Sequence, residues 1–324
     1  MTSQIVCIGD ALIDTFLSIH DAAKYCRIDH EHMEICFEAG AKIMVDDAQF
    51  QLGGNACNVS VGLSRLGFAT ALAAEIGTDE FSEKIIKGLQ KDNVSLDLVQ
   101  QTPDAPSTFS VCLNFKKERT LFVRHVTRKH ALDLEKITPD WIYLTSLGNE
   151  WEALYKKAQE YMQKTGAKVA FNPGSTQLLA GREHFKDILQ ITNILLVNKE
   201  EAEEILYGIV QHTQNEANKP STMVKELQKL GPKIVCITDG TNGSDAIDEK
   251  GELFHEGIVS AECVEKTGAG DAYSSGFVAA IINGETVQNA MKWGAVNSAN
   301  VITQYGAQPG LLTKTEILRR IGTL

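Results

Sequence analysis

The sequence predicts an α/β fold with a mostly parallel sheet, helices on both faces and a small β-sheet lid. Short apolar runs alternate with helical patterns along the chain, and this recurring β-then-α order is typical of parallel sheets. The apolar runs are uninterrupted, as expected for strands that are buried on both sides. The length of 324 residues and the hydrophobic content of 43% allow one large domain with a sizeable core.

The expected elements follow one another in a regular order. We interpret apolar runs as strands at 5–13, 70–77, 141–148, 168–175, 194–198 and 233–240. Helical patterns lie from Asn58 to about Leu66, near 80–91, at 151–164, after Asn198 and from about Asp271 to Ile282, before the stop signal Asn283–Gly284.

Two segments interrupt this order. Residues 15–52 carry little helix signal and several β-like pieces, and residues 108–125 predict a β-hairpin around Lys116–Glu118. We expect both segments to project from the main sheet and to form the lid.

Composition and charge disfavour several classes of protein. The formal net charge of −11 disfavours nucleic acids and anionic membranes as partners, because either needs a clustered basic face. No 18 apolar residues run together, so we expect no transmembrane helix, and the N-terminus carries no secretory signal. The seven cysteines are an odd number and lie mostly inside apolar runs, which predicts reduced thiols and a cytoplasmic location.

A stretch of small residues precedes the last of these helices. Gly268, Ala269 and Gly270 leave backbone N–H groups uncovered at a helix N-terminus, where the helix dipole adds partial positive charge. Such a terminus suits a phosphoryl group, and Asp271 follows it directly. The alternative is a tight strand-to-helix turn with Asp271 as an ordinary first-turn acid.

A second motif, LGGNACNVSVGLSRLG, covers residues 52–67. Gly53 and Gly54 allow close backbone approach, and Asn55 and Asn58 supply amide groups suited to hydroxyls. Asn58 would serve equally well as the N-cap of the amphipathic helix that follows.

Asn198 and Glu201 have the spacing of an N-cap residue and the third residue of a helix. A capping box explains the pair without any function. In the functional alternative, Glu201 helps to hold Mg²⁺ through water beside nucleotide phosphates.

Two further motifs follow predicted strands. Thr238, Gly240 and Gly243 form a turn that either meets a nucleotide or simply joins two strands. Asp10 and Asp14 lie in GDALID at the end of the first strand, and ligands of parallel sheets sit at the carboxyl ends of strands.

A cysteine and histidine cluster suggests a metal site at first sight. Its members are Cys26, His30, His32 and Cys36. The spacing matches no standard zinc finger and the segment alternates like a lid strand, so we do not expect zinc there.

Together and in this order, the motifs resemble the ribokinase-like (PfkB) carbohydrate kinase family over essentially the whole chain. GGNACNVSVGLSRLG is similar to the family's N-terminal signature, TGAGDAYSSGF to its C-terminal signature, and Asn198–Glu201 to its Asn-x-x-Glu motif for magnesium and phosphate. The resemblance implies a doubly wound domain over residues 1–324, with a lid at about 15–52 and 108–125 that often mediates homodimers.

The resemblance also implies a role for each motif. Asp271 would be the general base, with Gly268, Ala269 and Gly270 as the anion hole for the transferring phosphoryl group. The acceptor hydroxyls would be bound by Asp14, Gly53, Gly54 and Asn58. Along the ATP would lie Asn198, Glu201 (through water-held Mg²⁺), Thr238, Gly240, Gly243 and, beside the adenine, Asn297.

Two departures from the family pattern put potassium activation in doubt. Members activated by a monovalent cation usually carry Asp in a DT-x-GAGD arrangement, where this chain has Glu265 and Lys266. A serine that often contributes to the same ion site corresponds to Gly310.

The sequence therefore predicts an ATP- and Mg²⁺-dependent kinase that phosphorylates a hydroxymethyl group of a small sugar, of ribokinase or fructokinase type. The motifs of P-loop and protein kinases are absent. A nucleoside kinase is the alternative within this class. A non-catalytic sugar- or nucleotide-binding protein is the alternative outside it, and the presence of Asp271 favours the enzyme.

Overall fold

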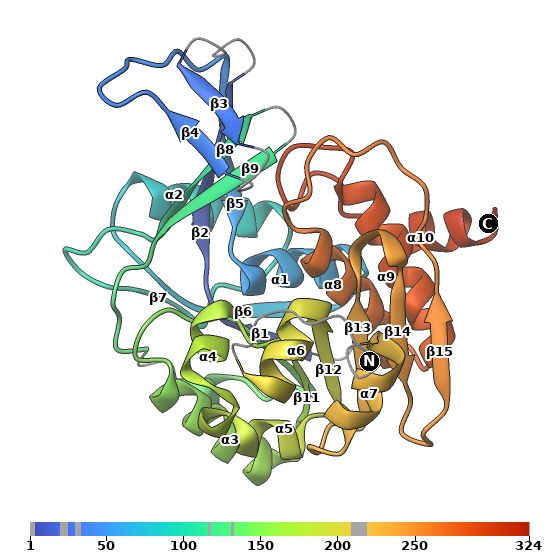
Figure 1. Ribbon diagram of the computed structural model, residues 1–324. Helices are drawn as coiled ribbons and strands as arrows, with labels where there is room; N and C mark the ends of the chain where they lie inside the picture. Colours follow the sequence, from blue (N-terminus) through green and yellow to red (C-terminus); the bar gives the residue numbers. More distant parts are fainter. Residues whose placement is uncertain are drawn as a thin grey trace.

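A central sheet covered by helices forms the body of the protein, and a smaller sheet projects from it (Figure 1). The computed structural model describes residues 4–19, 25–29, 34–115, 118–130, 133–208 and 219–323. Among these residues no helix is both long and apolar enough to span a bilayer.

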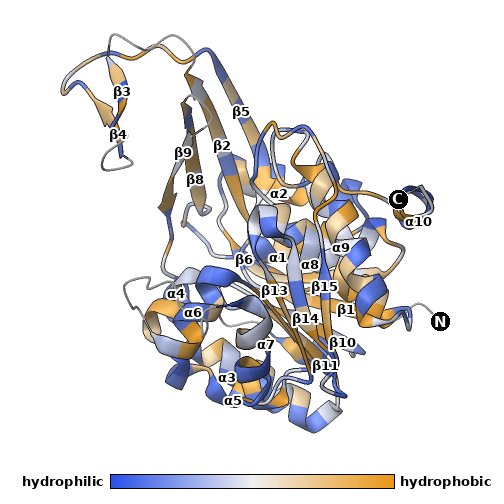
Figure 2. Cartoon of the chain, turned by 45° about the vertical axis from the view of Figure 1, so that its right-hand side comes forward, coloured by the Kyte–Doolittle hydropathy of each residue, from blue (hydrophilic) through white to orange (hydrophobic). Residues whose placement is uncertain are grey.

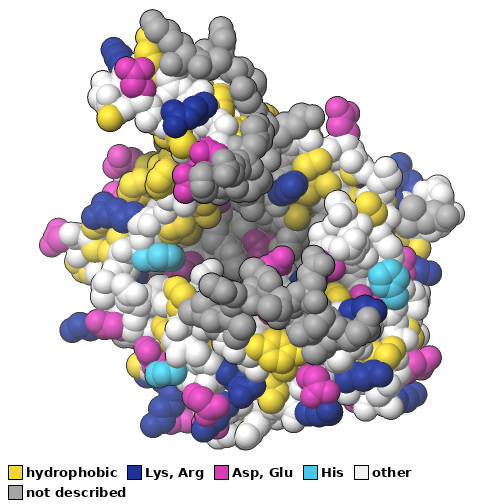
Figure 3. All heavy atoms as spheres, viewed as in Figure 1, with side chains coloured by type: hydrophobic (Ala, Val, Ile, Leu, Met, Phe, Trp, Pro, Cys, Tyr) yellow, Lys and Arg dark blue, Asp and Glu magenta, His cyan; other side chains and the backbone are white. Residues whose placement is uncertain are grey.

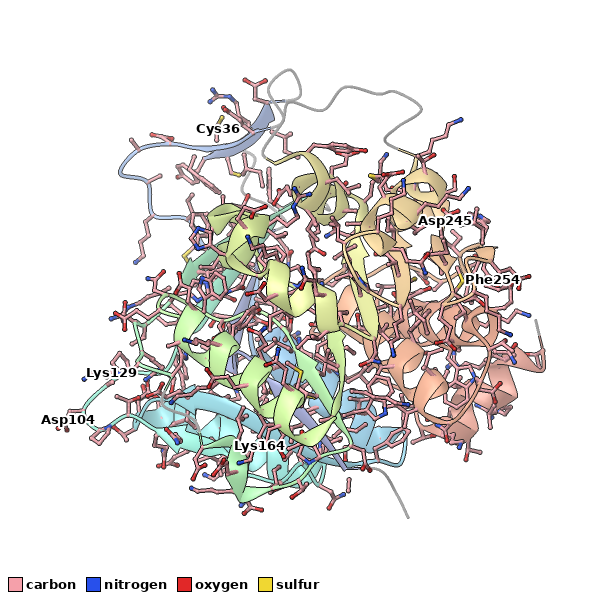
Figure 4. All side chains as sticks on the ribbon, turned by 90° about the horizontal axis from the view of Figure 1, so that it is seen from below. Cys36, Asp104, Lys129, Lys164, Asp245 and Phe254 are labelled. Carbon is pink, nitrogen blue, oxygen red and sulfur yellow. The ribbon has the colours of Figure 1, made fainter. Side chains whose placement is uncertain are left out.

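Nine strands of the described chain form the central sheet. Their order is β15 (Leu253–Glu256), β14 (Ser244–Ile247), β13 (Ile234–Thr238), β12 (Ile194–Asn198), β11 (Lys168–Phe171), β10 (Trp141–Leu144), β1 (Gln4–Ile8), β6 (Ala69–Ile76) and β7 (Val99–Gln101). The strands from β13 to β7 pair in parallel, whereas β14 pairs antiparallel with both β13 and β15, so among the described strands of this sheet β14 alone runs in the opposite direction. This arrangement confirms the predicted mostly parallel sheet. Figure 4 marks its two edges, with Asp104 beyond β7 on one side and Asp245 and Phe254 on β14 and β15 on the other.

Helices cover both faces of this sheet, as predicted. One face carries α1 (Asn55–Arg65), α2 (Glu80–Lys91), α8 (Ala269–Ile282), α9 (Val287–Val301) and α10 (Lys314–Ile321). The other carries α3 (Glu152–Thr165), α4 (Ser175–Ala180), α5 (Lys186–Ile191), α6 (Lys199–Tyr207) and α7 (Pro220–Gln228).

Strand β1 shows why its sequence is apolar throughout. Ile5 and Cys7 pack into the core beneath the first set of helices, and Val6 and Ile8 pack into the core beneath the second. Successive side chains of a strand point to opposite faces, so a strand covered on both sides needs apolar residues at every position. The hydropathy colouring shows the same apolar character in the neighbouring central strands (Figure 2).

The smaller sheet has the order β5 (Asp47–Gly53), β2 (Leu12–Ile19), β8 (Phe109–Phe115) and β9 (Glu118–Arg124). The predicted hairpin is confirmed by the antiparallel pair β8–β9, although its turn residues 116 and 117 lie outside the described residues. Strand β2 pairs in parallel with β8, which makes the sheet mixed. Because β2 follows β1 closely and β5 leads directly into α1, this sheet is held beside the carboxyl end of β1.

Two helices begin earlier than the sequence pattern indicated. Helix α1 begins at Asn55 with Gly54 as its N-cap residue, so Asn58 lies inside the helix and the N-cap interpretation of Asn58 is wrong. Helix α8 begins at Ala269 rather than at about Asp271. Gly54 and Gly268 have φ angles of 93° and 77°, which let the chain turn straight into a helix without a side-chain cap.

The two cysteines of the cysteine and histidine cluster lie on a hairpin at the far end of the smaller sheet, where Figure 4 labels Cys36. Strands β3 (Cys26–Asp29) and β4 (Glu34–Phe37) pair so that Cys26 lies opposite Phe37. Because Cys36 is the neighbour of Phe37, the two thiols point to opposite faces of this hairpin, which argues against one metal bound by both. His30 and His32 lie outside the described residues.

Candidate active site

A row of polar side chains on the smaller sheet faces the candidate site. Asp14 on β2 lies in register with Gln51 on β5 and with Ser110 on β8. The Ser110 hydroxyl donates a hydrogen bond to Asp14 Oδ1, and only 7% of Asp14 is exposed. The carboxylate of Asp14 is therefore buried between the side chains of Gln51 and Ser110, both of which are able to form hydrogen bonds. Such a row suits a hydroxylated ligand.

The glycine pair that follows β5 is required by close packing. A Cβ atom at Gly53 would collide with the Asp14 carboxylate, and one at Gly54 would collide with the backbone oxygen of Asp10. Only glycine leaves room here for Asp10, which follows β1, and for Asp14 on β2. The two glycines thus allow the Asp14 carboxylate and the Asp10 backbone to pack against the start of α1.

Helices α1 and α8 meet through a direct hydrogen bond between two predicted site residues. Asn58 Nδ2 donates to Asp271 Oδ2 over 2.8 Å. The two residues are 213 positions apart in the chain, and only 3% of Asn58 is exposed. The structure therefore brings the two signature motifs together, with Asp271 partly open at the start of α8.

The loop that leads into α8 consists of small residues and is held in place by hydrogen bonds and close packing. The N–H and hydroxyl groups of Thr267 each donate to the Glu265 carboxylate over 2.8 Å, and Gly268 packs so tightly that a Cβ atom would collide with Ala307. A Cβ atom at Gly270, in contrast, would meet nothing within 4 Å. Gly268 is thus needed for the turn, whereas Gly270 leaves open space at the helix N-terminus.

The N–H groups of this loop are not equivalent. The Ala269 N–H donates to Lys266 O over 3.2 Å, so it is already used within the turn. Among the described residues, Gly270 and Asp271 have no backbone acceptor within the protein for their N–H groups. The first turn of any helix leaves such donors unpaired, and here they flank the Asp271 carboxylate. Of the three residues expected to form an anion hole, Ala269 therefore has its N–H group already occupied, whereas the N–H group of Gly270 has no backbone acceptor among the described residues.

Three acidic residues of the site, Asp14, Glu201 and Asp271, influence one another electrostatically. Burial raises the pKa of Asp271 from 3.8 to about 7, the hydrogen bond from Asn58 opposes this rise, and the charges of Asp14 and Glu201 add to it. Burial likewise raises the pKa of Glu201 to about 7. A carboxyl group with a pKa near neutrality is poised to exchange a proton at physiological pH. Acidic side chains are visible in the hollow between the smaller sheet and the body (Figure 3).

Asn198 and Glu201 form the capping box at the start of α6. The Glu201 N–H donates to Asn198 Oδ1 over 2.8 Å, and the Asn198 N–H donates to Glu201 Oε2 over 2.9 Å. Asn172, at the end of β11, donates to the same oxygen over 3.4 Å. The structural role of the pair is therefore confirmed, and it does not exclude the second role, because Glu201 also acts electrostatically on Asp271.

The predicted nucleotide residues lie at the neighbouring strand ends. Thr238 ends β13 in register with Asn198, and the turn from Gly240 to Asn242 leads into β14. A Cβ atom at Gly243 would collide with Glu256 O, whereas one at Gly240 would meet nothing within 4 Å. The turn does join two antiparallel strands, and its open side is at Gly240.

Asn297 does not reach this surface. It has no exposed surface, its amide NH₂ donates to Ala272 O and Ser275 Oγ, and its oxygen accepts from the Leu312 N–H. All its hydrogen-bonding groups therefore join α9 to α8 and to the segment after α9. This correction removes the side chain of Asn297 from the predicted adenine contacts, because a buried and fully bonded amide has nothing left to offer a ligand.

The structure adds four residues that the sequence motifs did not single out. They are Ser110 beside Asp14, Asn172 beside Glu201, Arg128, whose charge acts on Asp10, and Gln308 beside Asn58. Each reaches the site from an element distant in the chain, so no local spacing indicates it.

The fold and the grouping of acidic residues around a bare helix N-terminus define an α/β phosphotransferase. The chain matches the pfkB family of carbohydrate kinases over residues 4–314 and belongs to that family. It is accordingly an ATP-dependent sugar kinase by class.

Individual relatives are distant. An uncharacterized sugar kinase of Archaeoglobus fulgidus is 26% identical over 258 residues, which cover 78% of this chain and 98% of that protein. A solved Arabidopsis thaliana ribokinase with ribose and ATP superimposes with a TM-score of 0.78 at 20% identity, covering 98% of each chain. A solved structure of a Burkholderia thailandensis nucleoside kinase with inosine superimposes with a TM-score of 0.80 at 16% identity, covering 99% of this chain and 98% of that one. At these identities the two solved structures establish the fold alone.

Proposed function

We propose that this protein transfers the γ-phosphoryl group of ATP to a hydroxymethyl group of a small sugar, with Asp271 as the general base. The observation that carries the proposal is the hydrogen bond between Asn58 and Asp271. It joins the motif expected to bind the acceptor to the motif expected to act on it.

The carboxylate of Asp271 takes the proton of the acceptor hydroxyl as its oxygen attacks phosphorus. Burial supports this role because it raises the pKa of Asp271 to about 7, close to the value at which a base works best. The backbone N–H of Gly270, with that of Asp271, stabilises the charge on the phosphoryl oxygens. Phosphoryl transfer needs positioning and charge neutralisation more than covalent chemistry, and these residues supply both.

The acceptor lies against the polar row of the smaller sheet. Asp14 accepts hydrogen bonds from the hydroxyl groups of the acceptor, and Asn58 adds a contact through its amide. Gly53 and Gly54 carry no side chains that would reduce the space for the acceptor. Residues of about 15–52 and 108–125 act as the lid that closes over it and excludes water.

The nucleotide lies along the ends of β12 and β13, near Asn198, Thr238, Gly240 and Gly243. The residues present fit a divalent cation, since Glu201 is an oxygen donor, and the negative charges of Asp14 and Glu201, which raise the pKa of Asp271, would be offset by Mg²⁺. Glu201 would hold Mg²⁺ through water, and the bound ion would neutralise charge on the phosphates.

We also propose a cytoplasmic location and a homodimer formed through the lid. The structure places none of the seven cysteines, all among the described residues, in a disulfide bond, which suits a reducing compartment. The exposed apolar residues of β9, Leu121, Phe122 and Val123, supply a surface for the dimer.

A coupled assay of ADP release tests the proposal. The panel contains pentoses, hexoses, sugar acids and nucleosides, each with ATP and Mg²⁺. Turnover with a sugar, and not with a nucleoside, is the expected result. Turnover only with nucleosides would establish the alternative acceptor class, and no acceptor-dependent ADP release with any member of the panel would contradict the proposed acceptor.

A further inference from the structure

We propose that Gln308 is a positioning residue for phosphoryl transfer, because it holds the amide of Asn58 in the orientation that donates to Asp271. The inference rests on the proposed function, in which Asp271 is the base. Gln308 lies on the segment between α9 and α10 and belongs to neither signature motif.

The three side chains form a chain of hydrogen bonds in one direction. Gln308 Nε2 donates to Asn58 Oδ1 over 3.0 Å, and Asn58 Nδ2 donates to Asp271 Oδ2 over 2.8 Å. Only 8% of Gln308 is exposed, so solvent does not compete for these groups. An amide has one accepting end and one donating end, so occupying the oxygen of Asn58 turns its NH₂ group toward the carboxylate.

The backbone of Gln308 is itself clamped. Arg65 Nη1 donates to Gln308 O over 2.7 Å and to Leu311 O over 3.2 Å. The same guanidinium forms a bidentate pair with Asp92, at 2.7 Å from Nε to Oδ1 and 3.1 Å from Nη2 to Oδ2. Bidentate Arg–carboxylate pairs fix geometry as well as charge. Gln308 is therefore held from α1, the helix that also carries Asn58.

Consecutive residues of this segment touch three parts of the site. A Cβ atom at Gly306 would lie 2.9 Å from Gln51 Cγ on lid strand β5. Ala307 fills the space beside Gly268 in the loop before α8, and Gln308 bonds to Asn58 in α1. The segment 306–308 thus aligns the lid, the phosphoryl-binding loop and the base with one another.

The orientation of Asn58 matters because several groups oppose ionisation of Asp271. Asp14 and Glu201 bring negative charge, and Tyr143 and the Cys57 thiol are the other titratable groups coupled to it. The hydrogen bond from Asn58 lowers the pKa of Asp271 against these effects. If the amide turned over, its oxygen would face the carboxylate, and the pKa of Asp271 would rise.

The test compares Gln308→Met with a matched control, Gln228→Met. Gln228 Nε2 also donates two hydrogen bonds, to Lys233 O and Asp248 O, but it lies at the opposite end of β13 from the site. The measurement is the pH dependence of kcat/KM for the best acceptor at saturating ATP. We expect the acidic limb of Gln308→Met to move up by about one pH unit, a loss of about tenfold below that limb, with activity recovered at high pH. The control should keep the native limb.

A second substitution keeps the test independent of packing. Gln308→Glu cannot donate to Asn58 when ionised, so it should move the limb at least as far. A loss of activity that is equal at all pH values in both Gln308 variants, or an unshifted limb in both, would overturn the positioning role. If Asp271→Asn abolishes turnover while the Gln308 limbs stay in place, only the inference about Gln308 fails. If Asp271→Asn stays active, the proposed base itself is wrong.

Discussion

At the scale of single residues, the buried carboxyl group of Asp271 lowers the stability of the fold and is at the same time the proposed catalytic base. Burial raises its pKa from 3.8 to about 7, so the folded protein holds a proton there that the unfolded chain releases above pH 4. Folding stability contributed by this group is therefore highest below pH 4 and decreases as the pH rises toward 7. Such destabilisation is common at catalytic groups.

We expect Asp271→Asn to separate the two effects. Turnover should fall by about 10²–10⁴-fold or more, because Asn has no basicity, while ATP binding survives. The free energy of unfolding should increase by about 1–3 kcal/mol at pH 8 and change little at pH 4. Urea unfolding at both pH values, beside steady-state kinetics, measures this. Near-native turnover would contradict the role as base.

Glu265 yields a prediction about monovalent cations. Only 5% of Glu265 is exposed, and its carboxylate accepts two hydrogen bonds from Thr267, so it stabilises the loop before α8. A Cβ atom at Gly310 would lie 2.6 Å from Asn300 O, which leaves no room for the family's serine in this backbone. We expect K⁺ to stimulate turnover weakly or not at all. The measurement compares KCl with choline chloride at constant ionic strength, and strong stimulation by K⁺ would show that the prediction is wrong.

The parts of the candidate site that are formed by residues close together in the chain could be predicted from the sequence. The small residues before Asp271 and the glycines before Asn58 are adjacent in the chain, so their chemistry is visible as motifs. The bond between Gln308 and Asn58 spans 250 positions, and no periodicity links them. Asn297 was predicted at the adenine because a motif alone cannot show that its amide is consumed within the core.

At the scale of elements, the start of α8 contains two glycines in different surroundings. Gly268 has a φ of 77° and no space for a side chain, whereas Gly270 has open space around its missing Cβ. The two positions therefore serve as each other's control.

We expect Gly270→Val to lower kcat far more than it lowers thermal stability, because the side chain would fill the space where the phosphoryl group approaches. A Gly268→Val variant should lose stability first, since it forces a β-branched residue into a left-handed conformation and into Ala307. Thermal unfolding and kcat are compared for both variants. If Gly270→Val loses stability and activity in parallel, the loop is only structural.

Strand β2 carries the prediction for the acceptor. A buried carboxylate that accepts two hydroxyl hydrogen bonds contributes on the order of 1.5–3 kcal/mol for each. Asp14→Ala should therefore raise the acceptor KM by about tenfold or more and change the ATP KM much less, because 1.4 kcal/mol corresponds to a factor of 10. Kinetics with each substrate varied separately measure this, with Ser18→Ala, further along the same strand, as the control. Equal effects on both substrates would refute the role of Asp14 in acceptor binding.

Elements were easier to predict than their pairing. The parallel strands of the central sheet follow from apolar runs because each run is buried on both faces. The parallel pairing of β2 with β8 and the antiparallel edge β14–β15 depend on contacts between distant or alternating segments, which a local pattern does not encode.

At the scale of the whole molecule, the smaller sheet ends in an edge strand whose apolar side chains are exposed in the part of the chain that the structure describes. Strand β9 is an outer strand, and its consecutive residues Leu121, Phe122 and Val123 are 53%, 56% and 43% exposed. Apolar side chains on both faces of an edge strand are a liability unless another chain covers them. Figure 3 shows hydrophobic side chains gathered beside the smaller sheet on this side of the molecule.

We predict that the protein is a homodimer in solution and that Phe122→Lys makes it a monomer. Phe122 is the best position to change, because it lies in register with Val111 and Thr15, one residue away from the row that contains Ser110 and Asp14. The substitution therefore charges the proposed interface without entering the acceptor row. Leu179→Lys, at an exposed leucine on α4 in the body of the protein, is the control and should leave the dimer intact. Sedimentation equilibrium or light scattering at micromolar concentration measures the mass, which for the native protein should be about twice 35.5 kDa. A native protein that sediments as a monomer would contradict the prediction, and so would a Phe122→Lys variant that stays dimeric, because the interface would then lie elsewhere.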